Sequence, residues 1–202
     1  MLVDAGAVHH GYVADITRTI AQGSSVFDAL IAGLDQAQQT LMQTIKPGVS
    51  FVDLHRAMHH AIYTLLKTHG IVRGNVSHDE ADQVRISSAF FPHGLGHLLG
   101  IQVHDIGGWQ HSAGGEIIAP PSEHPYLRLT RVLEQGFVVT IEPGLYFIPA
   151  LLQPLKKTAL GKDLDWTLVD ALTPWGGIRI EDNICVTAEG IENYTRDAFA
   201  LR

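Results

Sequence analysis

The chain has 202 residues, 46% of them hydrophobic and 17% charged, which fits one globular domain and excludes a disordered chain. Its net charge of -7, without a basic run, argues against nucleic acid or an anionic membrane as a partner. The single cysteine excludes an internal disulfide, no apolar run reaches the ~20 residues of a membrane span, and no signal pattern is present, so we expect a cytoplasmic protein.

The N-terminal residues predict a β-hairpin. Segments 1–8 and 12–20 have the pattern of two strands, and His9-His10-Gly11 lies between them, with glycine to relieve the turn. Asp4 and Asp15 then lie on paired strands. Their carboxylates can converge on one point although they are distant in sequence.

Two helices are expected to follow. Segment 24–45 has apolar residues every three to four positions, which is typical of an amphipathic helix, and segment 46–48 ends it. Ser50 begins a pattern similar to a capping box. The second helix should run to about Thr68 and stop near Gly70.

The second half of the chain is expected to combine loops and strands. Segment 107–126 is rich in glycine and proline and predicts a long loop, which in a compact domain tends to be functional. Segment 137–141 predicts a strand with a sharp exit at Glu142-Pro143-Gly144. Segment 150–175 is expected to be an irregular insertion, and segment 178–186 to be the final strand.

Four carboxylates lie beside apolar strand residues, where an unpaired charge is costly to bury: Asp4, Asp15, Glu142 and Glu181. A turn position would explain the aspartates without a site, and a structural salt bridge would explain the glutamates. A metal ion is the other natural partner. Carboxylates combined with one imidazole suit two hard divalent ions better than a lone tetrahedral zinc.

Three histidines, His93, His97 and His104, lie within twelve residues. An isolated histidine is usually a surface residue or a packed core residue. Here the motif His93-Gly94-Leu95-Gly96-His97 interleaves histidine with glycine, which allows close backbone approach. The cluster therefore favours a site.

The motifs together resemble a known family. Segments 91–105, 125–131 and 176–183, with the motifs around Asp4 and Asp15, are similar to the pita-bread metallopeptidases of family M24. That group contains methionine aminopeptidase, aminopeptidase P, creatinase and prolidase. Within it, the chain most resembles the bacterial prolidases, or Xaa-Pro dipeptidases, and the similarity runs over nearly the whole chain.

The resemblance implies an α+β pita-bread fold, in which helices flank a curved antiparallel sheet. Residues 1–202 would form the C-terminal part of the catalytic domain, incomplete at its N-terminus because the first ligand is already Asp4. We therefore expect this chain alone to associate or to be marginally stable. For full-length members, the resemblance implies a homodimer.

The resemblance also implies two divalent metal ions, for which we expect Mn²⁺, with Co²⁺ and Zn²⁺ as the alternatives. In this reading Asp4 chelates one ion, Asp15 and Glu181 bridge both ions, and His97 and Glu142 bind the same ion. A hydroxide held between the two ions would attack the scissile carbonyl.

Further roles follow from the same resemblance. Glu142 would also carry the proton of the bridging water, and His93 and His104 would donate hydrogen bonds to the substrate carbonyl or to the gem-diolate intermediate. Thr17 and Arg179 would orient the metal-binding carboxylates, although a purely structural role explains these two residues equally well.

Arg128 bears on the size of the substrate. It lies fourteen residues before Glu142, the spacing at which prolidases hold the C-terminal carboxylate of an Xaa-Pro dipeptide. A guanidinium suits a carboxylate, and cleavage of long peptides gains nothing from this grip. The expected activity is therefore dipeptide hydrolysis, with organophosphate hydrolysis as a side activity. The alternatives are aminopeptidase P activity, a non-enzymatic binding module and an inactive fragment.

Overall fold

The computed structural model describes residues 1–112 and 114–201. Its strands pair in antiparallel ladders. Strand β1 pairs with β4, β2 with β3, β5 with β8, β8 with β9, and β6 with β7. The bounds of the strands are β1 Leu2–Ala5, β2 Val8–His9, β3 Tyr12–Val13, β4 Ile16–Thr19, β5 Val138–Ile141, β6 Gly144–Tyr146, β7 Gly177–Arg179, β8 Asp182–Val186 and β9 Ile191–Asn193.

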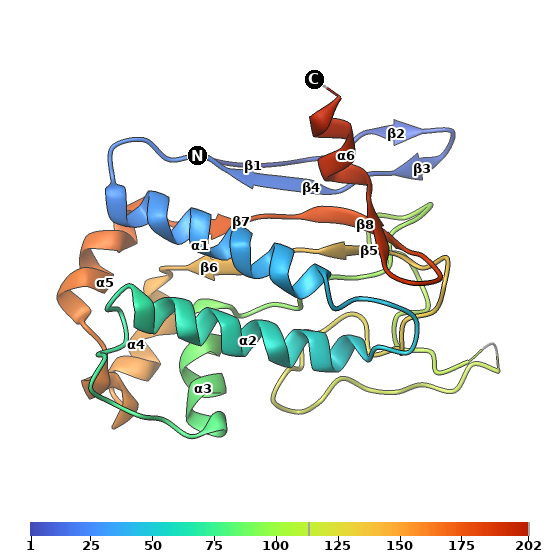
Figure 1. The fold of residues 1–202 in the computed structure, drawn as a ribbon. Coiled ribbons are helices and arrows are strands. Elements are labelled where there is room, and N and C mark those ends of the chain that lie inside the picture. Colours follow the sequence, from blue (N-terminus) through green and yellow to red (C-terminus); the bar gives the residue numbers. More distant parts are fainter. Residues whose placement is uncertain (113, 202) are drawn as a thin grey trace.

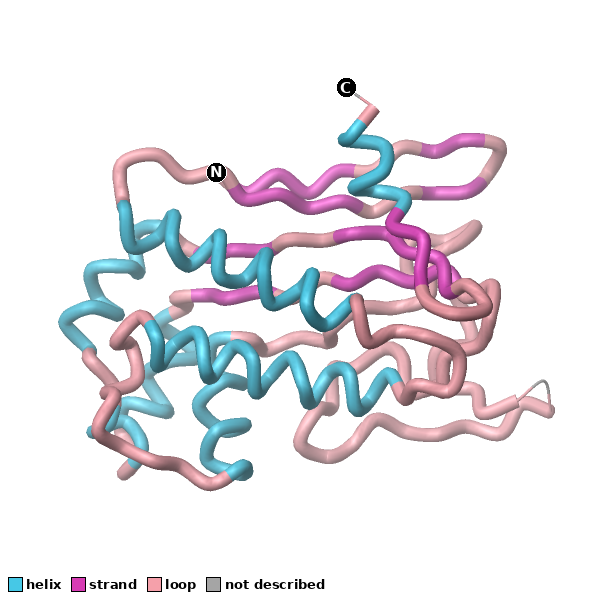
Figure 2. Tube along the Cα trace, in the orientation of Figure 1, coloured by secondary structure: helices cyan, strands magenta, loops and turns pink. Residues whose placement is uncertain are grey.

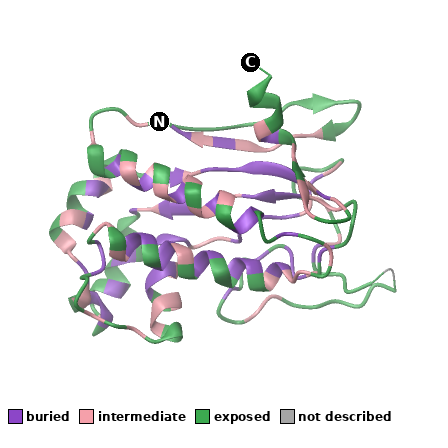
Figure 3. Cartoon of the chain, viewed as in Figure 1, coloured by how far each residue is buried: buried purple, intermediate pink, exposed green. Residues whose placement is uncertain are grey.

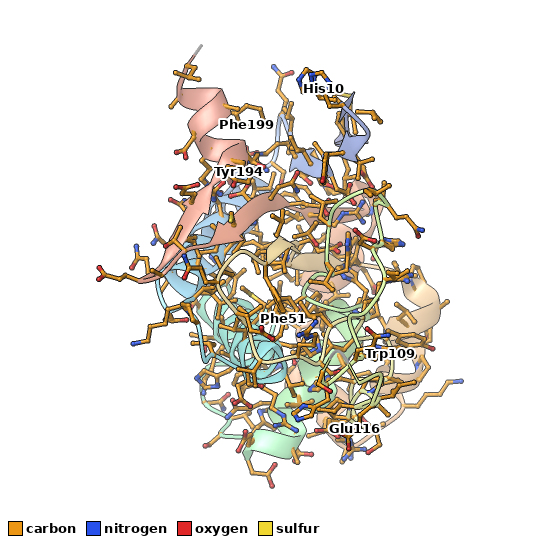
Figure 4. The ribbon with its side chains drawn as sticks, turned by 90° about the vertical axis from the view of Figure 1, so that its right-hand side faces the viewer. His10, Phe51, Trp109, Glu116, Tyr194 and Phe199 are labelled. Atoms are coloured by element: carbon orange, nitrogen blue, oxygen red, sulfur yellow. The ribbon has the colours of Figure 1, made fainter. Side chains whose placement is uncertain are left out.

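The predicted N-terminal hairpin is present as two consecutive ladders, β1–β4 and β2–β3. At its tip, His10 and Gly11 have φ angles of 50° and 86°, the left-handed values that a tight hairpin turn requires. Figure 4 shows His10 at this end of the molecule. The turn holds strands β1 and β4 in the register that sets Asp4 across from Thr17.

The ladders join into five neighbouring rows, in the order 95–99, β5–β6, β7–β8, β4 and β1. The first two rows are linked by backbone N–H donation from Thr140 to the carbonyl of His97, at 3.0 Å. The third and fourth rows are linked through an isolated bridge between Thr17 and Glu181. Segments that are far apart in the sequence therefore lie side by side in one sheet (Figure 2).

Helices α1 (Ser25–Met42) and α2 (Phe51–Thr68) run along one face of this sheet (Figure 1). Both predicted helices are confirmed, and their purple buried sides face inward in Figure 3. Gln38 on α1 is buried and donates hydrogen bonds to the backbone oxygens of Ile141 at 2.6 Å and Ile180 at 3.2 Å. The side chains of Ile141 and Ile180 belong to the hydrophobic core. Because side chains alternate along a strand, the next residues, Glu142 and Glu181, point to the opposite face of the sheet.

Two expectations for the second half are wrong. Residues 150–175 are not irregular, because they form two α-helices and two 3₁₀ turns. Residues 178–186 are not one final strand. The chain is interrupted at Ile180-Glu181, where it changes partner from β6 to β5, and β9 and α6 follow. The elements are α4 Pro149–Lys156, η1 Leu160–Asp163, α5 Trp166–Leu172, η2 Thr173–Trp175 and α6 Tyr194–Ala200.

Helix α3 (Glu80–Phe90) has no counterpart among the sequence-based expectations. The expected long loop at 107–126 is present as described apart from residue 113, and it contains no strand beyond an isolated bridge between Gln110 and Ile117. Across the described residues, none of the helices has the length and apolar character needed to cross a membrane.

Candidate metal centre

Each of the five rows contributes one candidate ligand to a common centre. The donor atoms of these five residues, together with His104, form three overlapping groups, and within each group the atoms lie within 4.8 Å of one another. Sheet geometry explains the convergence, because neighbouring rows present side chains of one face at close spacing. The groups are Asp4, Asp15 and Glu181; His97, Glu142 and Glu181; and Asp15, His97 and His104.

Glu142 and Glu181 lie opposite each other in the sheet. Ile141 pairs with Asp182 and Gly144 pairs with Arg179, so the same register sets Glu142 across from Glu181. Like charges in that position destabilise a sheet. Burial raises the pKa of Glu142 to about 7, and burial together with the charge of Glu142 raises the pKa of Glu181 to about 8.

These carboxylates fit a bound cation. Within the described residues, Oε1 of Glu181 is buried and has no hydrogen-bond partner, so one acceptor facing the centre is unsatisfied. A divalent ion would satisfy that oxygen and compensate the repulsion between Glu142 and Glu181. The oxygen-rich donor set suits hard divalent metals.

The ring of His97 is oriented as a metal ligand would be. Its Nδ1–H donates to the carbonyl oxygen of Leu98 at 2.9 Å, which leaves the Nε2 lone pair facing the carboxylates. Nε2 lies 3.3 Å from Oε1 of Glu142 and 3.6 Å from Oδ2 of Asp15. Burial lowers the pKa of His97, but the neighbouring acceptors Asp15, Leu98 and Glu142 raise it overall, so the site attracts positive charge at Nε2.

Thr17 and Arg179 hold the other side of the centre. Thr17 Oγ1 donates to Oε2 of Glu181 at 2.7 Å and accepts from Nε of Arg179 at 3.1 Å. The guanidinium of Arg179 also forms an ion pair with Asp4. The arginine therefore ties the exposed first aspartate to the buried glutamate.

Three positioning residues escaped the sequence analysis. Asn183 accepts from the backbone N–H of Asp15 at 3.0 Å and donates to the Asp15 carbonyl, which fixes the chain just before β4. Thr140 Oγ1 accepts from the backbone N–H of His97 at 3.1 Å and donates to Glu142 at 3.4 Å. The third residue, Tyr146, acts on His93. Nothing in residue type or spacing distinguishes these three from other polar strand residues.

A cleft of about 700 Å³ opens beside the centre, and Figure 4 shows Trp109 on the loop at its margin. His93 Nδ1–H donates to the carbonyl of Gly94 at 2.8 Å, so its Nε2 accepts from the Tyr146 hydroxyl at 2.9 Å. Burial lowers the pKa of His93 to about 4. The lining includes Pro92, His93, Gly94, Gly96, His104, Trp109, Pro125, Tyr126, Arg128, Glu142, Leu151 and Arg179.

His104 and Arg128 face this cleft from the exposed side. The ring of His104 lies edge-on to that of His97, with 4.4 Å between centroids. Burial, followed by the charges of His97 and Arg128, lowers the pKa of His104. The cleft thus combines carboxylates, imidazoles and one exposed guanidinium in a single wall.

Comparison with solved structures defines the fold class. The chain superposes on proline aminopeptidase P II from Yersinia pestis with a TM-score of 0.70 and 31% identity, over 97% of this chain and 38% of that one. The low-pH form of Escherichia coli aminopeptidase P gives a TM-score of 0.69 and 28% identity, with the same two coverages. The α+β pita-bread fold expected from the sequence is therefore confirmed.

The chain belongs to metallopeptidase family M24, which it matches over residues 1–188. It is 51% identical over 196 residues to an Xaa-Pro dipeptidase from Shewanella amazonensis, covering 97% of this chain and 44% of that protein. A second Xaa-Pro dipeptidase, from Aeromonas hydrophila, is 50% identical over 98% of this chain and 44% of that protein. The chain thus spans less than half the length of these relatives.

Proposed function

We propose that these residues form the metal centre of an Xaa-Pro dipeptidase. The observation that carries the proposal is the convergence of five ligand side chains, one from each row, beside a cleft that contains an exposed arginine. Two relatives that are 51% and 50% identical to this chain are named Xaa-Pro dipeptidase, which supports Xaa-Pro dipeptides as the substrate class. This ligand set would hold two divalent ions, preferentially Mn²⁺, which would supply Lewis-acid chemistry and an activated water nucleophile. The ligands are Asp4, Asp15, His97, Glu142 and Glu181.

The protein residues orient the substrate and move protons. Glu142 belongs to the centre and also lines the cleft, so its carboxylate lies where it can accept and return a proton during hydrolysis. His104 lies at the cleft surface, where it can donate to the substrate carbonyl. In its neutral form, His93 can make that donation only through a different tautomer or after protonation, because its N–H is already bonded to Gly94.

Arg128 sets the length of the substrate in this proposal. Its guanidinium lines the cleft from the segment that follows Tyr126, where it can hold the C-terminal carboxylate of a dipeptide. The alternative, cleavage of longer Xaa-Pro peptides, draws support from the fold match to aminopeptidase P. Organophosphate hydrolysis is proposed as a side activity, since a metal-activated hydroxide can also attack phosphorus esters.

The test compares substrates and an arginine variant in a protein extended upstream to the length of the relatives. We expect faster turnover of Leu-Pro than of Leu-Pro-Gly. Arg128→Ala should raise KM for Leu-Pro by about 10–100-fold, the effect of one charge-assisted contact, and should not affect an amidated dipeptide. Arg131→Ala, which removes an arginine paired with Glu134 at 2.7 Å, is the control. Equal KM changes for acid and amide would refute the role of Arg128.

Metal content is measured separately from turnover. Protein purified without chelators should hold two divalent ions per chain in the carboxylate centre, and Asp15→Asn combined with Glu181→Gln should remove both from that centre, because two of its shared carboxylates are lost. Retention of two ions by that double variant would contradict the assigned ligands.

A further inference from the structure

Three buried histidines meet outside the metal centre. His55 and His59 lie one turn apart on α2, and His124 comes from the long loop. Their side chains are almost fully enclosed, with relative exposures of 1%, 1% and 4%. One nitrogen from each ring lies within 4.8 Å of the other two.

Two nitrogens of this cluster lack a partner among the described residues: Nδ1 of His55 and Nε2 of His124. Leaving a polar atom buried and unpaired costs about 1–3 kcal/mol. A core that only needed to be filled would have used apolar side chains here. The unpaired Nε2 of His124 therefore indicates that something else binds at this position.

The hydrogen bonds around His59 fix the direction of its lone pair. The Ser87 hydroxyl donates to the carbonyl oxygen of Val84 at 3.1 Å, so its oxygen accepts from Nδ1–H of His59 at 2.9 Å. The other nitrogen, Nε2, is then unprotonated and accepts a hydrogen bond from Nε2–H of His55, whose proton a metal ion would replace. An imidazole whose outer N–H is held by a neighbouring acceptor is the usual arrangement of a metal-binding histidine.

The spacing of the rings fits a small ion. Nε2 of His55 and Nε2 of His59 are 3.2 Å apart. Two nitrogens bound tetrahedrally to zinc at 2.0–2.1 Å would be separated by roughly 3.3–3.4 Å. We propose that His55, His59 and His124 bind one zinc-class ion, in a third metal site that is separate from the carboxylate centre.

The chemistry of the cluster selects the ion. Burial, followed by the neighbouring histidines, lowers the pKa of His55 to about 2, and burial lowers that of His59 to about 3, so both rings are neutral at physiological pH. Three neutral imidazoles without a carboxylate suit zinc, copper or nickel better than manganese. A cavity of about 210 Å³ that all three histidines line has room for water as a fourth ligand.

The ion would link helix α2 to the loop. Pro125 and Tyr126, which follow His124, line both this cavity and the main cleft. Fixing His124 would therefore fix the wall that leads to Arg128. The role is to position this segment, and it does not require that the neighbouring centre be catalytic.

The experiment uses the 202-residue chain carrying Asp15→Asn and Glu181→Gln, which disables the carboxylate centre. After removal of metal with a chelator, equilibrium dialysis against Zn²⁺ should restore one bound ion per chain, whereas Mn²⁺ should not bind. With Co²⁺, the absorption spectrum should show the strong visible bands of a tetrahedral nitrogen site. Absence of zinc binding, or a spectrum of a six-coordinate oxygen site, would overturn the proposal.

Variants test the individual ligands in the same background. His59→Gln and His124→Phe should each weaken zinc binding at least tenfold, and His60→Ala, which removes the neighbouring exposed histidine, should leave it unchanged. If the two variants fail to fold, the melting temperature of the Asp15→Asn/Glu181→Gln parent tests the proposal instead. Zinc should raise this melting temperature and manganese should not. Equal zinc affinity in all three variants would show that the cluster is not the site.

Discussion

Gly96 lies so close to Thr140 that a Cβ atom built on the glycine would overlap with the threonine carbonyl oxygen. This contact belongs to the pairing of segment 95–99 with β5, in which Thr140 N–H donates to the His97 carbonyl at 3.0 Å. The glycine therefore allows the row that carries His97 to approach the row that carries Glu142.

The substitution Gly96→Ala should separate these two rows. We expect a loss of roughly 2–4 kcal/mol in the free energy of unfolding, because the obstacle is backbone and cannot rotate away, and we expect weaker metal binding. Urea denaturation and equilibrium dialysis measure the two effects. Gly74→Ala is the matched control, since nothing lies within 4 Å of its added Cβ. Equal stability of the two variants would disprove the close approach.

The metal-free chain should lose stability as the pH rises. The pKa values of Glu142 and Glu181 are raised to about 7 and about 8, whereas both groups ionise near 4.5 when the chain is unfolded. The folded state therefore holds protons that the unfolded state has released, and this stabilisation disappears as the pH passes through the raised values. Between pH 7 and 9 we expect a decrease of about 2 kcal/mol.

Urea denaturation in chelator at pH 7, 8 and 9 measures this slope, in a range well above the lowered pKa values of the buried residues His55, His59 and His93. Glu181→Gln should flatten it, because the variant has no proton to lose at that position. Glu116→Gln, which alters an exposed glutamate of the loop labelled in Figure 4, should keep the slope of the parent. A stability that increases with pH in this range would contradict the buried glutamate pair.

Thr17→Val removes the hydroxyl that donates to Glu181 and accepts from Arg179, with little change in volume. We expect a loss of about 1.5–3 kcal/mol in stability and a 10–100-fold weaker affinity for manganese. Denaturation and metal dialysis test this. The control is Thr64→Val, which removes an exposed hydroxyl on α2. An unchanged metal affinity would show that Thr17 stabilises the fold but does not orient Glu181 for metal binding.

His104→Ala separates substrate contact from metal binding. In the upstream-extended protein, turnover of Leu-Pro should fall by roughly 10²–10³-fold, as for the loss of one donor to the developing oxyanion. The bound metal should stay at the level of the parent. His111→Ala, which removes an exposed histidine of the nearby loop, serves for comparison. Loss of metal together with turnover would mean that His104 is a ligand instead.

Periodicity and local chemistry identified the elements with the clearest patterns. The hairpin, α1 and α2 were predictable because their turn, caps and apolar spacing all lie close together in the sequence. Helix α3 escaped because few of its residues are buried: Ile86, Ser87 and Phe90. Helix α4 has Pro154 inside it, which reads as a helix break.

The candidate ligands were predictable for a different reason, namely their resemblance to a family. What the sequence could not indicate is how the ligands are supported, because Asn183 and Thr140 act through contacts across rows. Two members of the histidine cluster could be placed together from the sequence, since His55 and His59 have the spacing of one helical turn. His124 joins them only through tertiary packing, which residue spacing does not reveal.

The order of the rows across the sheet differs from the order of their segments along the chain. Asp4 lies in the most N-terminal strand, but its neighbour across β4 is the row that carries Glu181, which follows helices α1 to α5 along the chain. A partly folded chain in which the β7–β8 row has not yet paired with β4 offers a metal ion only part of the proposed ligand set. With the proposed ligands, complete metal binding therefore requires that the β7–β8 row has already paired with β4, so folding of the sheet precedes assembly of the metal site.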